Sequence, residues 1–303
     1  MYDVVIIGSG PAGLSAAVYA KRALLNVLLI DKSAMSGGQV INTSEVDNYL
    51  GMPGVSGIEM AMAFKAHADS FEPETIIGEV AEIKCENDYN LITMMDKSEI
   101  KTKTIILATG AKYRLLNVKG EAEFKGRGVS YCATCDGAFF REKCVAVIGG
   151  GDVALEDAIY LSKICKKVYL INRRMELRGS KHLQNKMSEC ENVKFLGDFE
   201  VDSINGETKV QNIVIRNNKT QEEKQLDVDG IFIAIGMVPE SDLVKSLVKT
   251  DEGGYVIAGE DTITSNRSIF AVGDVRTKPL RQIITAAADG AVAVYEVEKY
   301  LHL

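Results

Sequence analysis

The sequence predicts an α/β protein with two Rossmann-like nucleotide-binding units. Three observations support this: two glycine-rich turns that each follow a short apolar run, a helical pattern after each turn, and a second apolar run after each helix. The chain has 303 residues, a length typical of about two domains.

The first unit begins close to the N-terminus. Residues 3–7 form an apolar run, and the G-x-G-x-x-G turn of residues 8–13 follows directly. A helical stretch over residues 14–22 comes next, and a second apolar run over residues 27–30 ends at Asp31. Strand, turn, helix, strand and acidic residue are the order typical of a dinucleotide-binding unit.

The residue types of this turn suit a bound pyrophosphate. Gly8 would permit the tight turn, Gly10 would let the pyrophosphate approach the backbone, and Gly13 would let helix and strand pack closely. The N-terminus of the helix favours negative charge. Asp31 is placed to accept hydrogen bonds from a ribose.

The same order returns about 140 residues later in the sequence. Residues 143–148 predict a strand, and the G-x-G-x-x-A turn of residues 149–154 follows. A helix is expected over residues 154–165 and another strand over residues 168–171.

The second unit ends in basic residues where the first ends in an acid. Asn172 is followed by Arg173 and Arg174, and Arg178 comes shortly after. Guanidinium groups pair with a ribose 2′-phosphate, which a carboxylate would repel. This pattern favours NADP(H), and a solvated charge cluster is the alternative.

The rest of the chain predicts strands and one more helix. Apolar strands that end in glycine close the two units, and alternating stretches predict antiparallel strands inserted in each. These expected elements are strands over 105–110 and 231–236, antiparallel strands within 76–95 and 210–228, a strand over 268–272 and a helix over 285–300.

Composition and charge exclude several classes of partner. The net charge of −7 and the pI of about 5.2 argue against nucleic acid, since phosphate binding needs a basic surface. The sequence shows no apolar run of the roughly 18 residues that a membrane span needs, and its start lacks signal-peptide features. We therefore expect a cytoplasmic protein.

Two of the six cysteines stand in a C-x-x-C motif, Cys132 and Cys135. A disulfide in so small a ring tends to be labile and catalytic. A zinc site would need further ligands, and the three histidines are not suitably spaced, so no metal is expected. Asp136 is a candidate acid–base group, with a simple Asp-Gly turn as the alternative. The scattered cysteines are expected to act as small apolar residues: Cys85, Cys144, Cys165 and Cys190.

These motifs together resemble the low-molecular-weight NADPH-dependent thioredoxin reductases along nearly the whole chain. The most specific stretches are C-A-T-C-D-G at residues 132–137 and G-D-V-R-T-K-P-L-R-Q at residues 273–282. The other matching stretches are residues 8–13, Gly37-Gly38-Gln39, Val46-Asp47-Asn48-Tyr49, Ala108-Thr109-Gly110, residues 149–154, and Arg173-Arg174 with Arg178.

The resemblance implies a domain organisation. Residues 1–113 and 242–303 would form a discontinuous FAD-binding domain, and residues 114–241 an inserted NADPH-binding domain with the C-x-x-C. Both would be Rossmann-like, three-layer ββα domains. The family forms homodimers and swings one domain against the other, and we expect hinges near residues 112–119 and 239–242.

The resemblance also implies candidate site residues. Cys132, Cys135 and Asp136 would be catalytic, with Cys135 facing the flavin and Cys132 attacking the disulfide of thioredoxin. Candidate cofactor-binding residues of the first unit are Gly8, Ser9, Gly10, Pro11, Ala12, Gly13, Asp31, Gly38, Gln39, Asn48, Thr109, Gly110, Gly273, Asp274, Arg281 and Gln282. Those of the second are Gly149, Gly150, Gly151, Asp152, Val153, Arg173, Arg174, Arg178, Ile235 and Gly236.

Three positions depart from the family pattern: the family commonly has His in place of Asn172, Ser or Thr in place of Val153, and Asp in place of Met175. The arginines remain, so NADPH is the expected donor. The alternatives are a thioredoxin reductase reduced by ferredoxin or another donor, and the reductase partner of a peroxidase system. A non-catalytic FAD-binding or redox-sensing protein would not need the C-x-x-C, and a ferredoxin–NADP reductase would lack it.

Overall fold

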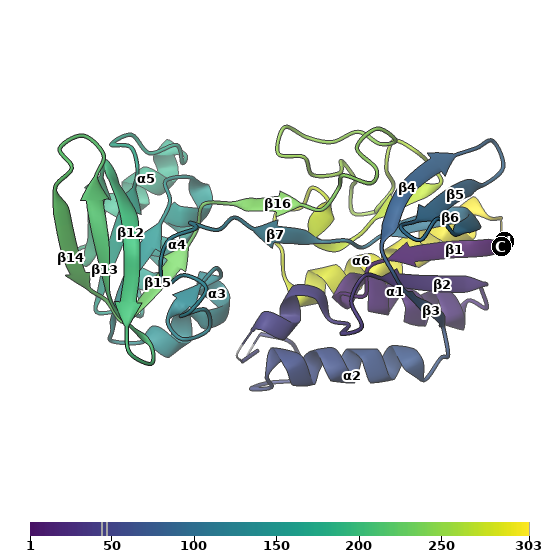
Figure 1. The fold of residues 1–303 in the computed structure, drawn as a ribbon, viewed down its shortest axis with the longest axis horizontal. Coiled ribbons are helices and arrows are strands. Elements are labelled where there is room, and N and C mark those ends of the chain that lie inside the picture. The colour runs from purple at the N-terminus through teal and green to yellow at the C-terminus, as the bar shows by residue number, and fades with distance from the viewer. Residues whose placement is uncertain (44, 47, 303) are drawn as a thin grey trace. The chain divides into compact units, whose positions relative to one another are not determined.

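The chain crosses twice between two units of the fold, as shown by a computed structural model that describes residues 1–43, 45–46 and 48–302 (Figure 1). Unit 1 consists of Met1–Lys112 and Val238–Leu303, and unit 2 of Tyr113–Met237. Strands β7 (Ala111–Tyr113) and β16 (Met237–Pro239) pair where the chain crosses. The return to unit 1 therefore comes at residue 238, earlier than the residue 242 expected from the family.

A mostly parallel sheet forms the middle of unit 1. Its strands are β1 (Tyr2–Ile7), β2 (Val27–Asp31), β3 (Glu74–Ile77), β4 (Val80–Cys85), β5 (Asn90–Met94), β6 (Glu99–Leu107) and β17 (Ile269–Ala271). The order is β3-β2-β1-β6-β5-β4, and β17 also pairs with β6. β4 and β5 are antiparallel, as expected, but Ile76 and Ile77 belong to β3, which runs parallel to β2. The expectation of an antiparallel strand is wrong for these two residues because they extend the parallel sheet.

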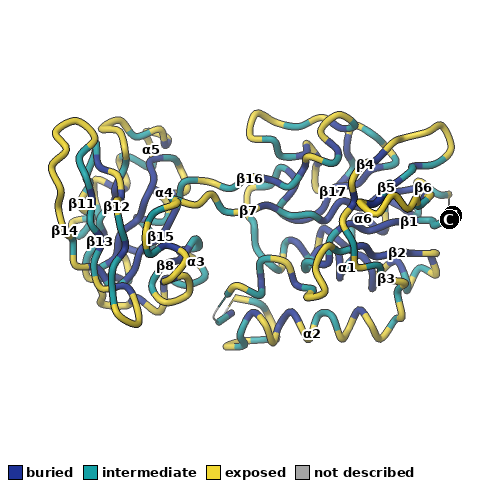
Figure 2. Tube along the Cα trace, viewed as in Figure 1, coloured by how far each residue is buried: buried dark blue, intermediate teal, exposed yellow. Residues whose placement is uncertain are grey.

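The strand alternation divides unit 1 into layers. Val4 and Ile6 of β1 pack with the helices on one face of the sheet, whereas Val5 and Ile7 pack on the other face with β4, β5 and residues 243–258. All four side chains are buried, which is typical of a central parallel strand (Figure 2). The helices are α1 (Pro11–Arg22), η1 (Gly38–Asn42), α2 (Gly57–Asp69), η3 (Gly273–Val275) and α6 (Ile283–Tyr300).

Unit 2 repeats this layered plan. Its parallel sheet has the order β11-β10-β9-β15-β8, formed by β8 (Val129–Ser130), β9 (Cys144–Ile148), β10 (Lys167–Asn172), β11 (Val193–Gly197) and β15 (Gly230–Ile233). An antiparallel sheet consists of β12 (Phe199–Gly206), β13 (Val210–Asn217) and β14 (Glu223–Asp227). The helices are α3 (Ala133–Asp136), η2 (Gly137–Phe140), α4 (Asp152–Ser162) and α5 (Lys181–Ser188).

The two faces of β9 show why unit 2 has three layers. Ala146 and Ile148 pack with side chains of the antiparallel sheet, and Val145 and Val147 pack with α4. Helices, parallel sheet and antiparallel sheet thus form the ββα sandwich, and the predicted α/β fold with two Rossmann-like units is confirmed.

Helix ends differ slightly from the expected ones. α1 begins at Pro11, since proline suits the first helical turn. α4 ends at Ser162 and not at Cys165. Among the helices of the described residues, none is long and apolar enough to cross a membrane.

Candidate redox and nucleotide-binding sites

The glycine-rich turn of unit 1 connects β1 to α1. Gly8 has a φ of +108°, and a Cβ there would lie 2.4 Å from the Ala108 carbonyl oxygen. A Cβ on Gly13 would lie 1.9 Å from the Gly8 carbonyl oxygen. At Gly10, by contrast, no described atom outside Gly10 and its two chain neighbours lies within 4 Å of the Cβ position. Gly8 and Gly13 are therefore required by packing, and Gly10 leaves space beside the backbone.

The N-terminus of α1 faces this space without a cap. Its N-cap residue is Gly10, which has no side chain to accept a hydrogen bond from the first backbone N–H groups. These N–H groups and the helix dipole suit an anion. Asp31 Oδ2 accepts hydrogen bonds from the backbone N–H (2.6 Å) and hydroxyl (2.5 Å) of Ser9, which tie the turn to the end of β2.

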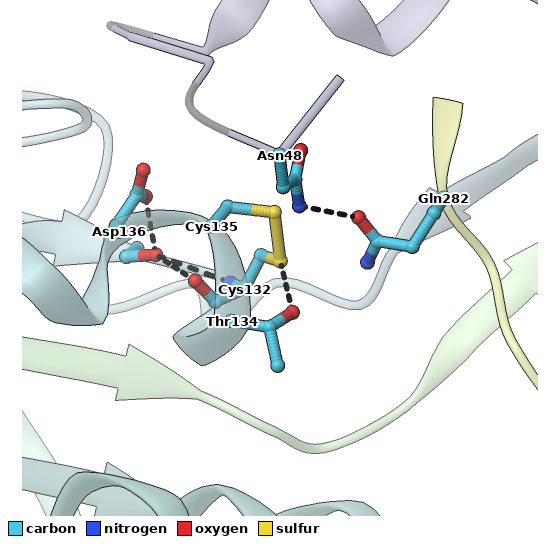
Figure 3. Close-up of a disulfide and its surroundings, with 7 residues drawn as sticks. Asn48, Cys132, Thr134, Cys135, Asp136 and Gln282 are labelled. Carbon is cyan, nitrogen blue, oxygen red and sulfur yellow. Dashed lines mark hydrogen bonds between the residues drawn. A yellow bond between two sulfur atoms is a disulfide. The ribbon is translucent and has the colours of Figure 1, made fainter. Parts of the chain in front are cut away.

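Segments distant in sequence contact one another in unit 1, and one of them lies against the turn. A Cβ on Gly38 would lie 3.3 Å from the Gly10 Cα, so the start of η1 lies against the turn. The Gln39 amide donates a hydrogen bond to the Ala111 carbonyl. Asn48 Nδ2 donates to Gln282 Oε1 at 2.9 Å (Figure 3). Asp47, which belongs to the same matching stretch as Asn48, lies outside the described residues.

Two further candidates lie at the end of β6. The Thr109 hydroxyl donates a hydrogen bond to the Glu240 carbonyl at 2.6 Å. Gly110 has a φ of +74°, and its Cβ position is open with respect to the described atoms. Thr109 thus fixes the chain where it returns to unit 1.

The segment at η3 brings unpaired polar atoms to the same region. A Cβ on Gly273 would lie 3.2 Å from the Ala12 Cβ, next to the start of α1. Asp274 Oδ1 and Arg281 Nε are buried, and neither has a hydrogen-bond partner in the described part of the chain. Burial raises the pKa of Asp274, although Lys278 and Arg281 oppose this. A buried acceptor, a buried donor and an uncapped helix fit a ligand with hydroxyl and phosphate groups.

A buried cluster of charged side chains holds this segment against α6 by hydrogen bonds. Asp289 of α6 accepts hydrogen bonds from Arg276 Nε (2.8 Å), Arg276 Nη2 (2.7 Å) and Lys278 Nζ (2.9 Å). It also accepts one from the Gly273 backbone N–H at 2.8 Å. Burial alone would raise the pKa of Asp289, but the bonds from Arg276 and Lys278 hold it below its ordinary value. The resemblance did not single out Asp289.

The second glycine-rich turn connects β9 to α4 in the same way. Gly149 has a φ of +147°, and a Cβ there would lie 2.4 Å from the Ala234 carbonyl oxygen. No described atom outside Gly151 and its two chain neighbours lies within 4 Å of the Gly151 Cβ position, and Gly151, the N-cap residue of α4, has no side chain to cap the helix. A second open anion site thus lies at a helix N-terminus. Val153 is 57% exposed beside it.

The arginine-bearing segment after β10 is tied to this turn by its backbone. The Asn172 amide donates to the carbonyls of Arg174 (2.8 Å) and Glu176 (3.2 Å). The Arg178 backbone N–H donates to the Gly150 carbonyl at 2.7 Å. Asn172 stands at a position where the family commonly has His. Its side-chain amide therefore holds the backbone of the arginine-bearing segment in place.

Asp152 adds a further tie, since its carboxylate accepts a hydrogen bond from the Ser180 backbone N–H at 2.6 Å. The guanidinium groups of Arg173, Arg174 and Arg178 are exposed, and within the described residues none forms an ion pair. Three cations are thus available to a phosphate. Ile235 and Gly236 lie just past the end of β15, and the Gly236 carbonyl accepts a hydrogen bond from the Arg114 N–H at 3.0 Å.

Cys132 and Cys135 form a disulfide with their Cα atoms 5.3 Å apart (Figure 3). Cys132 precedes α3, and Cys135 lies within it. The Thr134 hydroxyl lies 3.4 Å from the Cys132 sulfur. Both cysteines are partly exposed, so the disulfide remains accessible.

Asp136 follows the disulfide as the last residue of α3 and is not part of a simple turn. Oδ2 of its carboxylate accepts a hydrogen bond from the Ser130 hydroxyl at 2.6 Å. Its Oδ1 is buried and has no partner in the described residues. Burial raises the pKa of Asp136, and the bond from Ser130 opposes that rise. An acid with a raised pKa suits proton transfer to a sulfur. Ser130 was missed because a lone serine in a short strand gives no sequence signal.

The other cysteines are free thiols. Cys165 is buried, and burial raises its pKa to about 11, so it is a poor nucleophile. Cys85 is exposed as a residue, but partial burial of its sulfur also raises the pKa of the thiol. Within the described residues, no group of three or more His, Cys, Asp or Glu side chains could hold a metal ion.

Comparisons with known proteins agree along the whole chain. The sequence profile of the pyridine nucleotide-disulphide oxidoreductases matches residues 2–290. The thioredoxin reductase of Bacillus subtilis (strain 168) is 42% identical over 302 residues, which span 99% of this chain and 95% of that protein. The crystal structure of thioredoxin reductase from Streptococcus pyogenes MGAS5005 has a TM-score of 0.94 at 46% identity and covers 100% of this chain and 98% of its own. Thioredoxin reductase from Giardia duodenalis has a TM-score of 0.94 at 32% identity, with coverages of 100% and 99%.

Proposed function

The chain belongs to the pyridine nucleotide-disulphide oxidoreductase family and groups with its thioredoxin reductases, and from that premise we propose that it is an NADPH-dependent thioredoxin reductase containing FAD. One observation carries the proposal: the Cys132–Cys135 disulfide occurs in a chain with two open, uncapped glycine-rich turns. A non-catalytic flavoprotein would not need the disulfide.

We propose that unit 1 binds FAD. The pyrophosphate would lie beside Gly10 at the N-terminus of α1, and Asp274 and Arg281 would use their unpaired atoms to hold the ligand. Asp31 would hold the ribose with the acceptor capacity that Ser9 leaves free. The amides at Gln39, Asn48 and Gln282 would line the flavin.

We propose that unit 2 binds NADPH. The N-terminus of α4 beside Gly151 would hold the pyrophosphate, and the exposed guanidinium groups of Arg173, Arg174 and Arg178 would hold the 2′-phosphate. Val153 and Ile235 would contact the nucleotide through apolar atoms.

The chemistry at the cysteines follows from thiol–disulfide exchange. Bound FAD would supply the two-electron chemistry that links the nicotinamide to the disulfide. Once reduced, the Cys132 thiolate would attack one sulfur of the thioredoxin disulfide, and the released thioredoxin sulfur would take up a proton. Cys135 would then attack the mixed disulfide, which frees the second thioredoxin sulfur and re-forms Cys132–Cys135. Asp136 would hold and return the protons.

The proposal also covers assembly, motion and location. We propose a homodimer whose units change their arrangement by rotation at β7 and β16, the two strands at the chain crossings. The four cysteines outside the Cys132–Cys135 disulfide suit a reducing cytoplasm. Crosslinking the two units should stop turnover, and full activity after crosslinking would contradict the rotation.

Stopped-flow spectroscopy tests the function. The purified protein should be yellow, NADPH should bleach the flavin much faster than NADH or reduced ferredoxin, and added thioredoxin should restore the colour. Cys135→Ser should still be bleached but should not reduce thioredoxin. If only reduced ferredoxin bleaches the flavin, the electron donor is ferredoxin and not NADPH. A colourless protein would refute the proposal.

A further inference from the structure

We propose that Ser130 is a positioning residue of the redox site: its hydroxyl fixes the Asp136 carboxylate against the backbone of Cys132. The inference rests on the proposed thiol chemistry at Cys132 and Cys135. It does not depend on which donor or which disulfide partner the protein uses.

The contacts of the Ser130 hydroxyl join the two ends of α3. Its oxygen accepts a hydrogen bond from the Cys132 backbone N–H at 3.1 Å and lies 2.6 Å from Asp136 Oδ2. The Cys132 carbonyl is a second acceptor but lies 3.3 Å away. Since a hydroxyl has one proton, the shorter distance assigns it to Asp136.

Strand pairing fixes where this hydroxyl lies. Ser130 is only 5% exposed and pairs with Phe232 of β15 in the parallel sheet. Cys132 follows two residues later and begins the turn of α3, whose N–H groups at Cys135 and Asp136 donate to the Cys132 carbonyl. The sheet thus holds the serine while α3 brings the carboxylate back to it.

Asp136 depends on this contact. In the described part of the chain, Ser130 provides the only hydrogen bond to its side chain, since Oδ1 is buried without a partner. Without the serine, both oxygens would lack a donor, and the ionised form would be disfavoured. The side chain would also be free to rotate away from the disulfide.

Other titrating groups near α3 are distinct from this pair. Tyr160 of helix α4 lies against Gly137, the residue after Asp136, and Asp157 lies one turn earlier in α4. Burial, with a smaller contribution from Glu156, raises the pKa of Asp157 to about 7. Neither is among the causes of the Asp136 shift, which are burial and Ser130. The Tyr131 hydroxyl donates to Glu121 at 2.9 Å.

The test uses the holoenzyme reduced with dithiothreitol and desalted. Its reaction rate with 5,5′-dithiobis(2-nitrobenzoic acid) is measured across pH, so neither NADPH nor thioredoxin is needed. A Cys132→Ser/Cys135→Ser variant gives the background from the other four cysteines. An inflection in the curve of rate against pH that is absent in Asp136→Asn belongs to Asp136. An inflection that is absent in Asp157→Asn belongs to Asp157 of α4.

In Ser130→Ala, the Asp136 inflection should move to higher pH, because the bond that favours the carboxylate is gone. Ser130→Thr, which keeps a hydroxyl, should restore it. When Asp136→Asn is already present, Ser130→Ala should change the rate of the thiol reaction less than about twofold. This is expected if Ser130 acts on the cysteines only through Asp136.

Two results would overturn the inference: an Asp136 inflection that stays in place in Ser130→Ala, or an equal effect of that change in the Asp136→Asn background. If Ser130→Ala does not fold, as judged by thermal melting, Ser130→Cys decides the matter, with Ser130→Cys/Cys132→Ser/Cys135→Ser as the background that contains the added thiol. Its thiol is a weaker donor, so the inflection should move in the same direction. A lack of NADPH or thioredoxin activity would count against the proposed function and would leave this result unaffected.

Discussion

Replacing Asp289 by Asn tests whether the buried ion cluster stabilises unit 1. The side chains of Arg276 and Lys278 are only 2% and 3% exposed, and Asp289 is the anion that both contact. Asparagine keeps the shape but removes the ion-pair partner of Lys278 and leaves Arg276 with only the exposed Glu260, at 3.8 Å. Removing one partner of a buried ion pair costs about 3–5 kcal/mol. We expect Asp289→Asn to reduce the free energy of unfolding by that amount.

Unfolding of the holoprotein in guanidinium chloride, followed by flavin fluorescence, measures the loss. With a slope of about 4 kcal/mol per molar, the midpoint should fall by about 1 M. The flavin content should fall too, since Asp289 also accepts from the Gly273 N–H beside the open turn. Asp69→Asn is the matched control, because Asp69 is half exposed in its pair with Lys65 and should contribute under about 1 kcal/mol.

The pH dependence of the same measurement has a definite sign. The pKa of Asp289 is lower in the folded protein than when unfolded, so its contribution is complete above the unfolded pKa of about 3.9. The contribution is lost as pH falls through the folded pKa. The difference between wild type and Asp289→Asn should therefore shrink below about pH 4. A midpoint within about 0.2 M of wild type at pH 7 would refute the reasoning.

Three further predictions concern the nucleotide sites. Gly13→Ala should yield a destabilised, flavin-poor protein, because its Cβ would lie 1.9 Å from the Gly8 carbonyl oxygen; normal flavin content by absorbance would contradict this. Gly10→Ala should keep the melting temperature of the flavin-free protein, since no described atom outside Gly10 and its two chain neighbours lies within 4 Å of its Cβ position, but should bind FAD more weakly in fluorescence titration; unchanged FAD affinity would place the pyrophosphate elsewhere. Arg174→Ala should raise the KM for NADPH about tenfold, with the KM for NADH unchanged, because a hydrogen-bonded charge contact contributes roughly 1.4 kcal/mol; steady-state kinetics with equal effects on both nucleotides would argue against a 2′-phosphate contact.

Features that depend on local backbone geometry were predictable from the sequence. Gly8 and Gly149 have positive φ angles and lie against neighbouring backbone, so only glycine suits these two positions. The two glycines therefore indicated the turns in the sequence. The buried strands were visible as continuous apolar runs, and the C-x-x-C spacing indicated a disulfide. These signals depend on residues that are neighbours in the sequence.

Contacts between side chains from different elements were not predictable in this way. Asp289 lies on an alanine-rich helix, and its bonds to Arg276 and Lys278 required the packing of α6 beside η3. Asn172 stood out only as a departure from the family, yet its amide shapes the arginine-bearing segment. The partner of each group is chosen by the fold and not by spacing along the chain.

The sequence by itself determined the α/β class, the two glycine-rich turns and the redox pair, because glycine conformation, strand burial and a short disulfide ring are local requirements. Only the tertiary structure decided which polar atoms of unit 1 remain unpaired and which serine meets Asp136. Hydrogen bonds and ion pairs form over about 3 Å, a distance that folding and not sequence position brings about.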